Sequence, residues 1–205
     1  LAFPLKRNMT VYRHTDGRLL LYSVIALEEK GMLALEALGT PTWVVVPHPL
    51  HKMDLPFYRN RYPHIQVLSV EQSPVNGVIV DGDPFVQLSS LGIRVTDVPG
   101  LKFREIVLSL PIPSGGYALC VCDILSKAQK SSGLRGWLLS LLGPPSGFGV
   151  ARIVRFGQIK DKKKVRDWLI NLSEESSDYQ MLLFAHGPAV KNDLKQQILA
   201  AATTI

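Results

Sequence analysis

The sequence predicts an α+β protein of the αββα type, a four-layer sandwich in which two sheets pack face to face and helices cover the outside. Three observations support this class. Short apolar runs rich in β-branched residues recur along the 205-residue chain, and amphipathic segments lie between them. The segments follow the order hairpin, helix, strand, helix, several strands, helices, strand, helix. That order favours two stacked sheets with outer helices.

The first half of the chain opens with a hairpin. Asp16-Gly17 lies between two apolar runs and predicts the hairpin turn, because both residues tolerate a positive φ. Leucines at helical spacing over 27–38 predict an amphipathic helix that ends at Gly39. Strands are expected at 43–46, 65–70 and 77–81, with a helix over 55–62.

The second half supplies most of the remaining strands and two clear helices. Strands are expected at 93–98, 104–110, 117–124 and 179–185, and helices at 160–172 and 192–202. The stretch 126–157 is harder to interpret. It contains an apolar, helix-like run at 137–142 and then a Gly-Pro-Pro-Ser-Gly break. We expect residues 1–205 to form a single domain, because this length suits one sizeable core.

Composition narrows the setting and the partners. The apolar share is 46%, the charged share is 20%, and no stretch of about 18 apolar residues could span a membrane. No secretory signal pattern opens the chain, and Cys120 and Cys122 lie two apart on one strand, where a bridge between them is disfavoured. A cytoplasmic protein with reduced, structural cysteines is expected.

The net charge of +6 raises the question of nucleic acid. Basic residues are scattered except at 160–164, and they do not interleave with aromatic residues as on a stacking platform. We therefore expect neither a nucleic-acid nor a membrane partner.

Polar side chains with metal-ligand chemistry follow three of the expected strands. His48 and His51 follow the run WVVV, Asp123 follows YALCVC, and His186 follows YQMLLFA. Imidazole suits zinc and iron, and a carboxylate completes or bridges such sites. Each residue alone is weak evidence, because a single histidine at a strand end is more often structural or exposed. Together they predict a metal-type cluster at the strand ends.

The order of these segments resembles that of the metallo-β-lactamase fold. VVVPHPLH takes the place of its Thr-His-x-His-x-Asp-His loop, DVPGLKF that of its Pro-Gly-His turn, ALCVCDIL that of its Gly-Asp and LLFAHG that of its last histidine. The opening RNMTVYRHTDGRLLLYSVIAL, with VVVPHPLH and FAHGPAV, looks closer still to an uncharacterised branch of the fold with eroded metal motifs. The resemblance implies a metal-dependent hydrolase ancestry.

The departures from that pattern are specific. His48 matches the first histidine of the first motif and His51 its last, so the second histidine and the aspartate have no equivalent. Asp54 is expected in the helix after the loop. Leu101 stands where the Pro-Gly turn should carry a histidine, whereas Asp123 and His186 match their motifs. The two-metal centre that generates hydroxide in this fold should therefore not form.

Three functions remain open. The leading one is a non-classical, non-catalytic member with a degenerate site, no resident cofactor, and an unknown small molecule or protein bound in the inherited groove. The first alternative is a mononuclear hydrolase of esters, amides or phosphoesters, in which a single zinc or iron ion is held by His48, His51, Asp123 and His186. The second is a homo-oligomeric scaffold that pairs through the apolar run 137–142, although burial of that run in its own core is favoured slightly.

Overall fold

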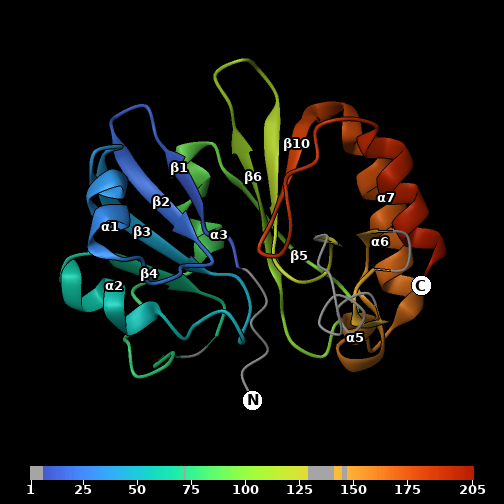
Figure 1. Cartoon of the computed structure of the whole chain (residues 1–205), viewed down its shortest axis with the longest axis horizontal. Coiled ribbons are helices and arrows are strands. Elements are labelled where there is room, and N and C mark those ends of the chain that lie inside the picture. Colours follow the sequence, from blue (N-terminus) through green and yellow to red (C-terminus); the bar gives the residue numbers. More distant parts are fainter. Residues whose placement is uncertain (1–6, 72, 129–140, 145–146) are drawn as a thin grey trace.

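The computed structural model describes residues 7–71, 73–128, 141–144 and 147–205. Two four-stranded sheets face each other, as Figure 1 shows. The first has the order β1-β2-β3-β4, with the bounds Thr10–Arg13, Arg18–Tyr22, Thr40–Val46 and Gln66–Ser69. The second has the order β10-β7-β6-β5, with the bounds Tyr179–Phe184, Tyr117–Val121, Ile106–Pro111 and Arg94–Asp97. A short pair, β8 and β9, comprises Ser126–Lys127 and Phe148–Gly149.

Helices cover the outer face of each sheet. On the first sheet lie α1 and α2, with the bounds Glu29–Glu36 and Leu55–Arg61. On the second lie α5, α6 and α7, with the bounds Arg152–Gly157, Lys162–Glu174 and Leu194–Thr203. A short helix, α3, and two 3-10 turns connect the strands, with the bounds Pro84–Gln87, Ser89–Leu91 and Glu175–Asp178. The αββα prediction is therefore confirmed. No helix among the described residues has the length and apolar character needed to cross a membrane.

The core has three layers, which the alternation along each strand creates. Leu19 and Leu21 of β2 point to the layer beneath α1 and α2, whereas Leu20 and Tyr22 point to the layer between the sheets. On β7, Leu119 and Val121 point towards the outer helices, and Cys120 joins the layer between the sheets. A period of two sends successive side chains to opposite faces of a sheet. Both cysteines are buried and free, in agreement with the sequence analysis.

Most of the expected elements form close to their predicted bounds, and the opening hairpin pairs antiparallel as predicted. The strand expected at 77–81 is wrong. Val75 and Val78 exchange backbone hydrogen bonds across a tight turn, so the apolar run after them follows β4 without forming a regular ladder. The end of α1 also differs, because Ala37 is its C-cap and Gly39 is needed instead where the chain passes the Gly17 carbonyl.

Two helices, α3 and α5, form where no helix was predicted, since each is too short to show a full helical period. Of the apolar run at 137–142, residues 137–140 lie outside the described part of the chain.

The strand directions bring several strand ends to one edge of the sandwich. In the first sheet β2 and β3 run parallel, and in the second β7 and β10 run parallel. Because β6 runs antiparallel to β7, the start of β6 lies beside the end of β7. The backbone N–H of Ile106 donates to the Pro47 carbonyl, and the hydroxyl of Tyr22 donates to the Ile106 carbonyl at 2.8 Å. These two bonds join the sheets at that edge.

Candidate metal site

The four residues singled out from the sequence lie together at this edge. His48 and His51 follow β3, Asp123 follows β7, and His186 follows β10. Oδ1 of Asp123 lies 3.2 Å from Nε2 of His51 and 3.3 Å from Nε2 of His186, and its Oδ2 lies 3.5 Å from Nδ1 of His48. The Asp123 carboxylate is therefore the centre of the cluster.

His51 is oriented from behind by Ser23. The Ser23 hydroxyl lies 2.8 Å from Nδ1 of His51, and both side chains are buried. Ser23 directly follows β2 and has a φ of 59°, in the left-handed region that non-glycine residues rarely adopt. A hydroxyl both donates and accepts, so it supports His51 whichever ring nitrogen carries the proton. In either case Nε2 of His51 faces Asp123.

His48 is held differently. Its Nδ1 accepts the backbone N–H of Leu50 at 3.2 Å, so that nitrogen carries no proton and cannot donate to Asp123. Burial lowers the pKa of His48 below its usual value, which agrees with a neutral ring. The Phe103 ring packs edge-on against it, with centroids 6.2 Å apart. The Nδ1 of His48 is thus engaged, whereas its Nε2 is buried and has no hydrogen-bond partner among the described residues.

The backbone after His186 adopts a conformation that requires glycine. Gly187 has a φ of 110°, and a Cβ at this position would lie 2.1 Å from the Lys127 carbonyl oxygen. The Lys127 N–H in turn donates to the His186 carbonyl at 3.3 Å. The close approach of these two chains requires glycine and fixes the turn that carries His186.

Glu105 is a further polar residue at this edge, and the sequence analysis missed it. It directly precedes β6 and is fully buried. Its carboxyl oxygens accept the backbone N–H groups of Cys122, Asp123 and Ile124 at 3.0–3.1 Å. The sequence showed only a glutamate inside an expected strand at 104–110, and one signal could have identified it: a charged residue followed by an unbroken apolar run.

The two buried carboxyl groups have opposite pKa shifts. Burial and the nearby Asp123 charge raise the pKa of Glu105 to about 8. Burial also raises the pKa of Asp123, but hydrogen bonds from His186 and His51 outweigh it and hold that pKa well below its usual range. The cluster therefore favours the charged form of Asp123, whereas burial disfavours the charged form of Glu105.

Two other positions do not join the cluster. Asp54 immediately precedes α2 and forms an ion pair with Arg7 at 2.6 Å. Leu101 packs against the core beneath the outer helices and forms a backbone bridge with Ile159. The Pro99-Gly100 turn before it is fixed by the Lys160 N–H, which donates to the Gly100 carbonyl at 2.8 Å. Neither position supplies a ligand atom beside Asp123.

The donor set fits one metal ion better than two. A tetrahedral zinc or iron ion with bonds of about 2.0–2.1 Å separates neighbouring ligand atoms by roughly 3.3 Å, and Oδ1 of Asp123 has this spacing to both His51 and His186. Among the described residues, the group whose ligand atoms all lie within 4.8 Å of one another is His51, Cys122 and Asp123, and it does not include His186.

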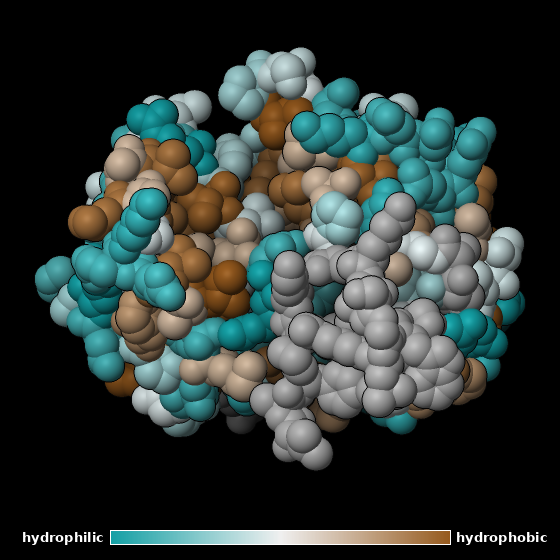
Figure 2. Space-filling view, viewed as in Figure 1, coloured by the Kyte–Doolittle hydropathy of each residue, from teal (hydrophilic) through white to brown (hydrophobic). Residues whose placement is uncertain are grey.

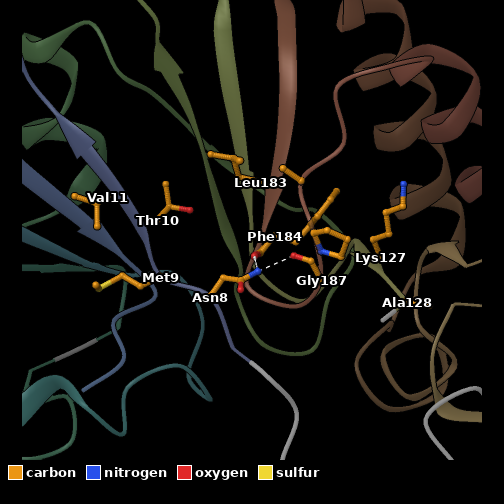
Figure 3. A pocket seen from close by; sticks show the side chains of 11 residues that line it. Asn8, Met9, Thr10, Val11, Lys127, Ala128, Leu183, Phe184 and Gly187 are labelled. Carbon is orange, nitrogen blue, oxygen red and sulfur yellow. Dashed lines mark hydrogen bonds between the residues drawn. The ribbon is translucent and has the colours of Figure 1, made fainter. Parts of the chain in front are cut away.

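A groove opens beside the cluster. It has a volume of about 900 Å³ and lies between β1 and β10, as Figure 3 shows. The Asn8 side chain closes one end of it by donating to the carbonyls of Phe184 and Gly187 at 2.9 and 2.6 Å. The groove reaches the turn that carries His186, but His48, His51 and Asp123 do not line it.

The surface near the cluster, in the loop after β3 and the segment before β6, is partly apolar. Leu50, Met53 and Phe103 are 60%, 64% and 50% exposed, although large apolar side chains are costly to leave in water. On the face shown in Figure 2, hydrophobic side chains gather over the first-sheet half and between the two halves, whereas hydrophilic ones cover the side of α7. These three side chains, two from the loop after β3 and one from the segment before β6, offer contacts to a ligand with an apolar part.

Comparison with known proteins identifies the fold. No family model and no curated protein matches the chain. Solved structures do match, among them the metallo-beta-lactamase FIM-1 from Pseudomonas aeruginosa in its mono-zinc form, with a TM-score of 0.60 and 13% identity over 98% of this chain and 84% of that one. DIM-1 metallo-beta-lactamase matches with a TM-score of 0.63 and 13% identity, over 98% of this chain and 88% of that one. A metallo-beta-lactamase from Erythrobacter litoralis matches with a TM-score of 0.60 and 14% identity, over 98% of this chain and 83% of that one.

These likenesses extend over nearly the whole chain, and they agree with the two facing sheets and their outer helices. The chain has the metallo-β-lactamase fold. At 13–14% identity it is a distant representative of that fold.

Proposed function

We propose that this protein is a non-classical member of the metallo-β-lactamase fold that binds one metal ion and does not carry out two-metal hydrolysis. The observation that carries the proposal is the spacing of His51, Asp123 and His186, whose donor atoms lie 3.2 and 3.3 Å apart around Oδ1. A histidine and carboxylate set suits zinc or iron. The mono-zinc form reported for FIM-1 lends support, because it gives a precedent for single occupancy within this fold.

His48 has a supporting role in this proposal. Its Nδ1 already accepts the Leu50 N–H, so it borders the ion without binding it. Ser23 takes the role usually filled by a partner of a metal-bound histidine, because it fixes the ring of His51 from the opposite nitrogen. Such a partner also raises the affinity of the histidine for metal.

A second candidate function is mononuclear hydrolysis of an ester, amide or phosphoester. It is favoured by the number of well-placed ligands, because three protein donors leave a fourth position open, and by the 21% exposure of the His186 side chain. When bound, zinc would supply a water whose pKa is lowered to about 7. The chain's own contribution would be orientation: Ser23 and His51 on one side, Asp123 in the centre, and exposed Phe103 as an apolar contact for substrate.

A metal-free cluster is the competing state. The Asp123 carboxylate already accepts hydrogen bonds from two histidines, and such a network satisfies buried polar groups without an ion. In that state a small molecule or protein bound near the groove would remain the expected partner. The homo-oligomeric scaffold stays a prediction, since most of the run 137–142 lies outside the described residues.

Elemental analysis of the purified chain for zinc, iron and manganese tests the proposal. We expect about one equivalent per chain, lost in His51→Ala and His186→Ala and retained in His14→Ala, a control histidine that pairs with Asp16 away from the site. His48→Ala should weaken binding without abolishing it. Two equivalents would contradict the single-ion site, and none after incubation with zinc would favour the metal-free cluster. A screen of chromogenic esters and phosphoesters on the loaded protein then separates binding from hydrolysis.

A further inference from the structure

Glu105 holds an unusual position among the charged residues of this chain. It is 0% exposed, directly precedes β6, and makes no ion pair with any described residue. A buried carboxyl group costs free energy unless hydrogen bonds compensate it. Here the compensation comes entirely from backbone N–H groups of another strand end, so its placement has a specific structural consequence.

The three N–H groups that Glu105 accepts are consecutive. They belong to Cys122, Asp123 and Ile124, directly after β7 ends at Val121. Past the end of a strand, buried amide groups lose their partners in the sheet and need another acceptor. Successive N–H groups that converge on the oxygens of one carboxyl group form a nest, an arrangement that fixes the backbone angles of the turn.

Asp123 is the middle residue of this nest. Its backbone N–H donates to Oε1 of Glu105 at 3.1 Å, and its side chain points to His51 and His186. The backbone on both sides of Asp123 is therefore fixed by one side chain. The side-chain direction of a residue follows from its backbone angles, so fixing the turn fixes where the carboxylate points.

We infer that Glu105 is a positioning residue: by holding the three amides of the turn after β7, it aims the Asp123 carboxylate at His51 and His186. The inference deepens the proposed function, because the spacing of those donor atoms is what the single-ion site depends on. It also applies to the metal-free cluster, because the same carboxylate is the acceptor there.

The experiment compares Glu105→Gln with the wild type and with Ser109→Ala. Ser109 is a buried polar residue on the same strand whose hydroxyl lies 3.1 Å from that of Tyr179, away from the cluster. Long-range ¹H–¹⁵N spectra of the histidine rings in metal-free protein report whether His51 and His186 still bond to Asp123. Cobalt(II) titration followed by visible absorption reports the affinity of the site.

Glu105→Gln should shift the ring signals of His51 and His186 and weaken cobalt(II) binding by about 10-fold to 100-fold, the range for partners of metal ligands. Ser109→Ala should leave both unchanged even where it lowers the unfolding temperature. A folded Glu105→Gln with wild-type ring spectra would overturn the inference. If that variant does not fold, Glu105→Asp, which keeps the carboxylate but shortens its reach, should show the same shifts, and unchanged ring spectra there would overturn the inference equally.

Two controls separate this inference from the proposed function. In an Asp123→Asn background, Glu105→Gln should add no further shift of the ring signals, because Glu105 acts through Asp123. A wild-type protein that takes up no cobalt(II) would refute the single-ion site, whereas the ring spectra of the metal-free protein would still decide the role of Glu105.

Discussion

The loop after β3 and the turn after β7 face each other across the candidate site, and each follows a buried strand. In the turn after β7, one buried side chain, Glu105, holds three consecutive amides, and the carboxylate of Asp123 points to two histidines. In the loop after β3, the Leu50 N–H occupies Nδ1 of His48, and Asp54 turns away to pair with Arg7. Both follow the end of a strand, yet only one presents its carboxylate to the site.

The difference shows which side of the proposed site supplies more donor atoms. The second sheet contributes Asp123 and His186, whereas the first sheet contributes one histidine, His51, whose Nε2 lies within 3.2 Å of the Asp123 carboxylate. A two-metal centre needs both sides. A site that is complete on one side and reduced on the other can still hold one ion.

The largest effect is expected when the two aspartates are compared directly. Asp123→Asn removes the charge that buried His51 and partly exposed His186 share, and breaking a buried pair in this way costs about 3–5 kcal/mol of unfolding free energy. Asp54→Asn breaks a partly exposed ion pair with Arg7, which should cost less than about 1 kcal/mol. Urea denaturation of both variants measures the contrast. Equal losses would contradict the view that, of the two segments, only the turn after β7 presents its carboxylate to the site.

The second-largest effect is the pH dependence of the unfolding free energy that comes from Glu105. Its pKa in the folded protein is raised to about 8, so its stabilising contribution is complete below its unfolded value of 4.5 and is lost as pH rises to about 8. The wild type should therefore lose stability relative to Glu105→Gln between these pH values, by an amount on the order of a few kcal/mol. His48 has a lowered pKa and acts in the opposite sense below pH 6.5, but it is common to both proteins.

Denaturation of the pair at pH 5, 6.5 and 8 gives the difference. A constant difference across this range would show that the carboxyl group of Glu105 is already ionised at the lowest pH, and the opposed pKa shifts of the two carboxyl groups would then be wrong.

A smaller effect is expected at Ser23, which supports the first-sheet side of the site. Ser23→Ala leaves Nδ1 of His51 buried without its partner, which should cost about 1–2 kcal/mol. The ring signals of His51 should shift, because the hydroxyl no longer constrains its tautomer. Thermal unfolding with ring ¹⁵N spectra measures both. An unchanged His51 spectrum would show that Asp123 alone orients the ring.

The smallest effect is expected when the motif is restored at position 101. Leu101→His should not raise the metal content above one ion per chain, because the side chain at this position packs against the core and the aspartate of the first motif is still missing. Elemental analysis of the loaded variant gives the stoichiometry. Two equivalents would mean that a single missing ligand separates this chain from a two-metal centre.

The sequence by itself determined the sheets and the strand ends. Alternation and β-branched runs placed β2, β3, β7 and β10, since each strand must bury alternate side chains on defined faces. Those strands end just before His48, Asp123 and His186, and the parallel pairing of neighbouring strands brings such residues to one edge. The departures expected at Leu101 and in the first motif stay predictions from the resemblance, because they depend on how the motifs are matched to the sequence.

Only the tertiary structure decided how those residues are held. No local sequence pattern indicates that the Leu50 N–H donates to His48 or that the Ser23 hydroxyl bonds to His51. Nor does one indicate that Glu105 accepts three backbone N–H groups from a turn 17–19 residues further on. The run 77–81 likewise has the composition of a strand but follows a tight turn at Val75 and Val78. The contacts of Ser23 and Glu105 join residues distant in the chain, and those of Leu50 and Val75 depend on the local course of the backbone. Hydrophobic periodicity encodes neither.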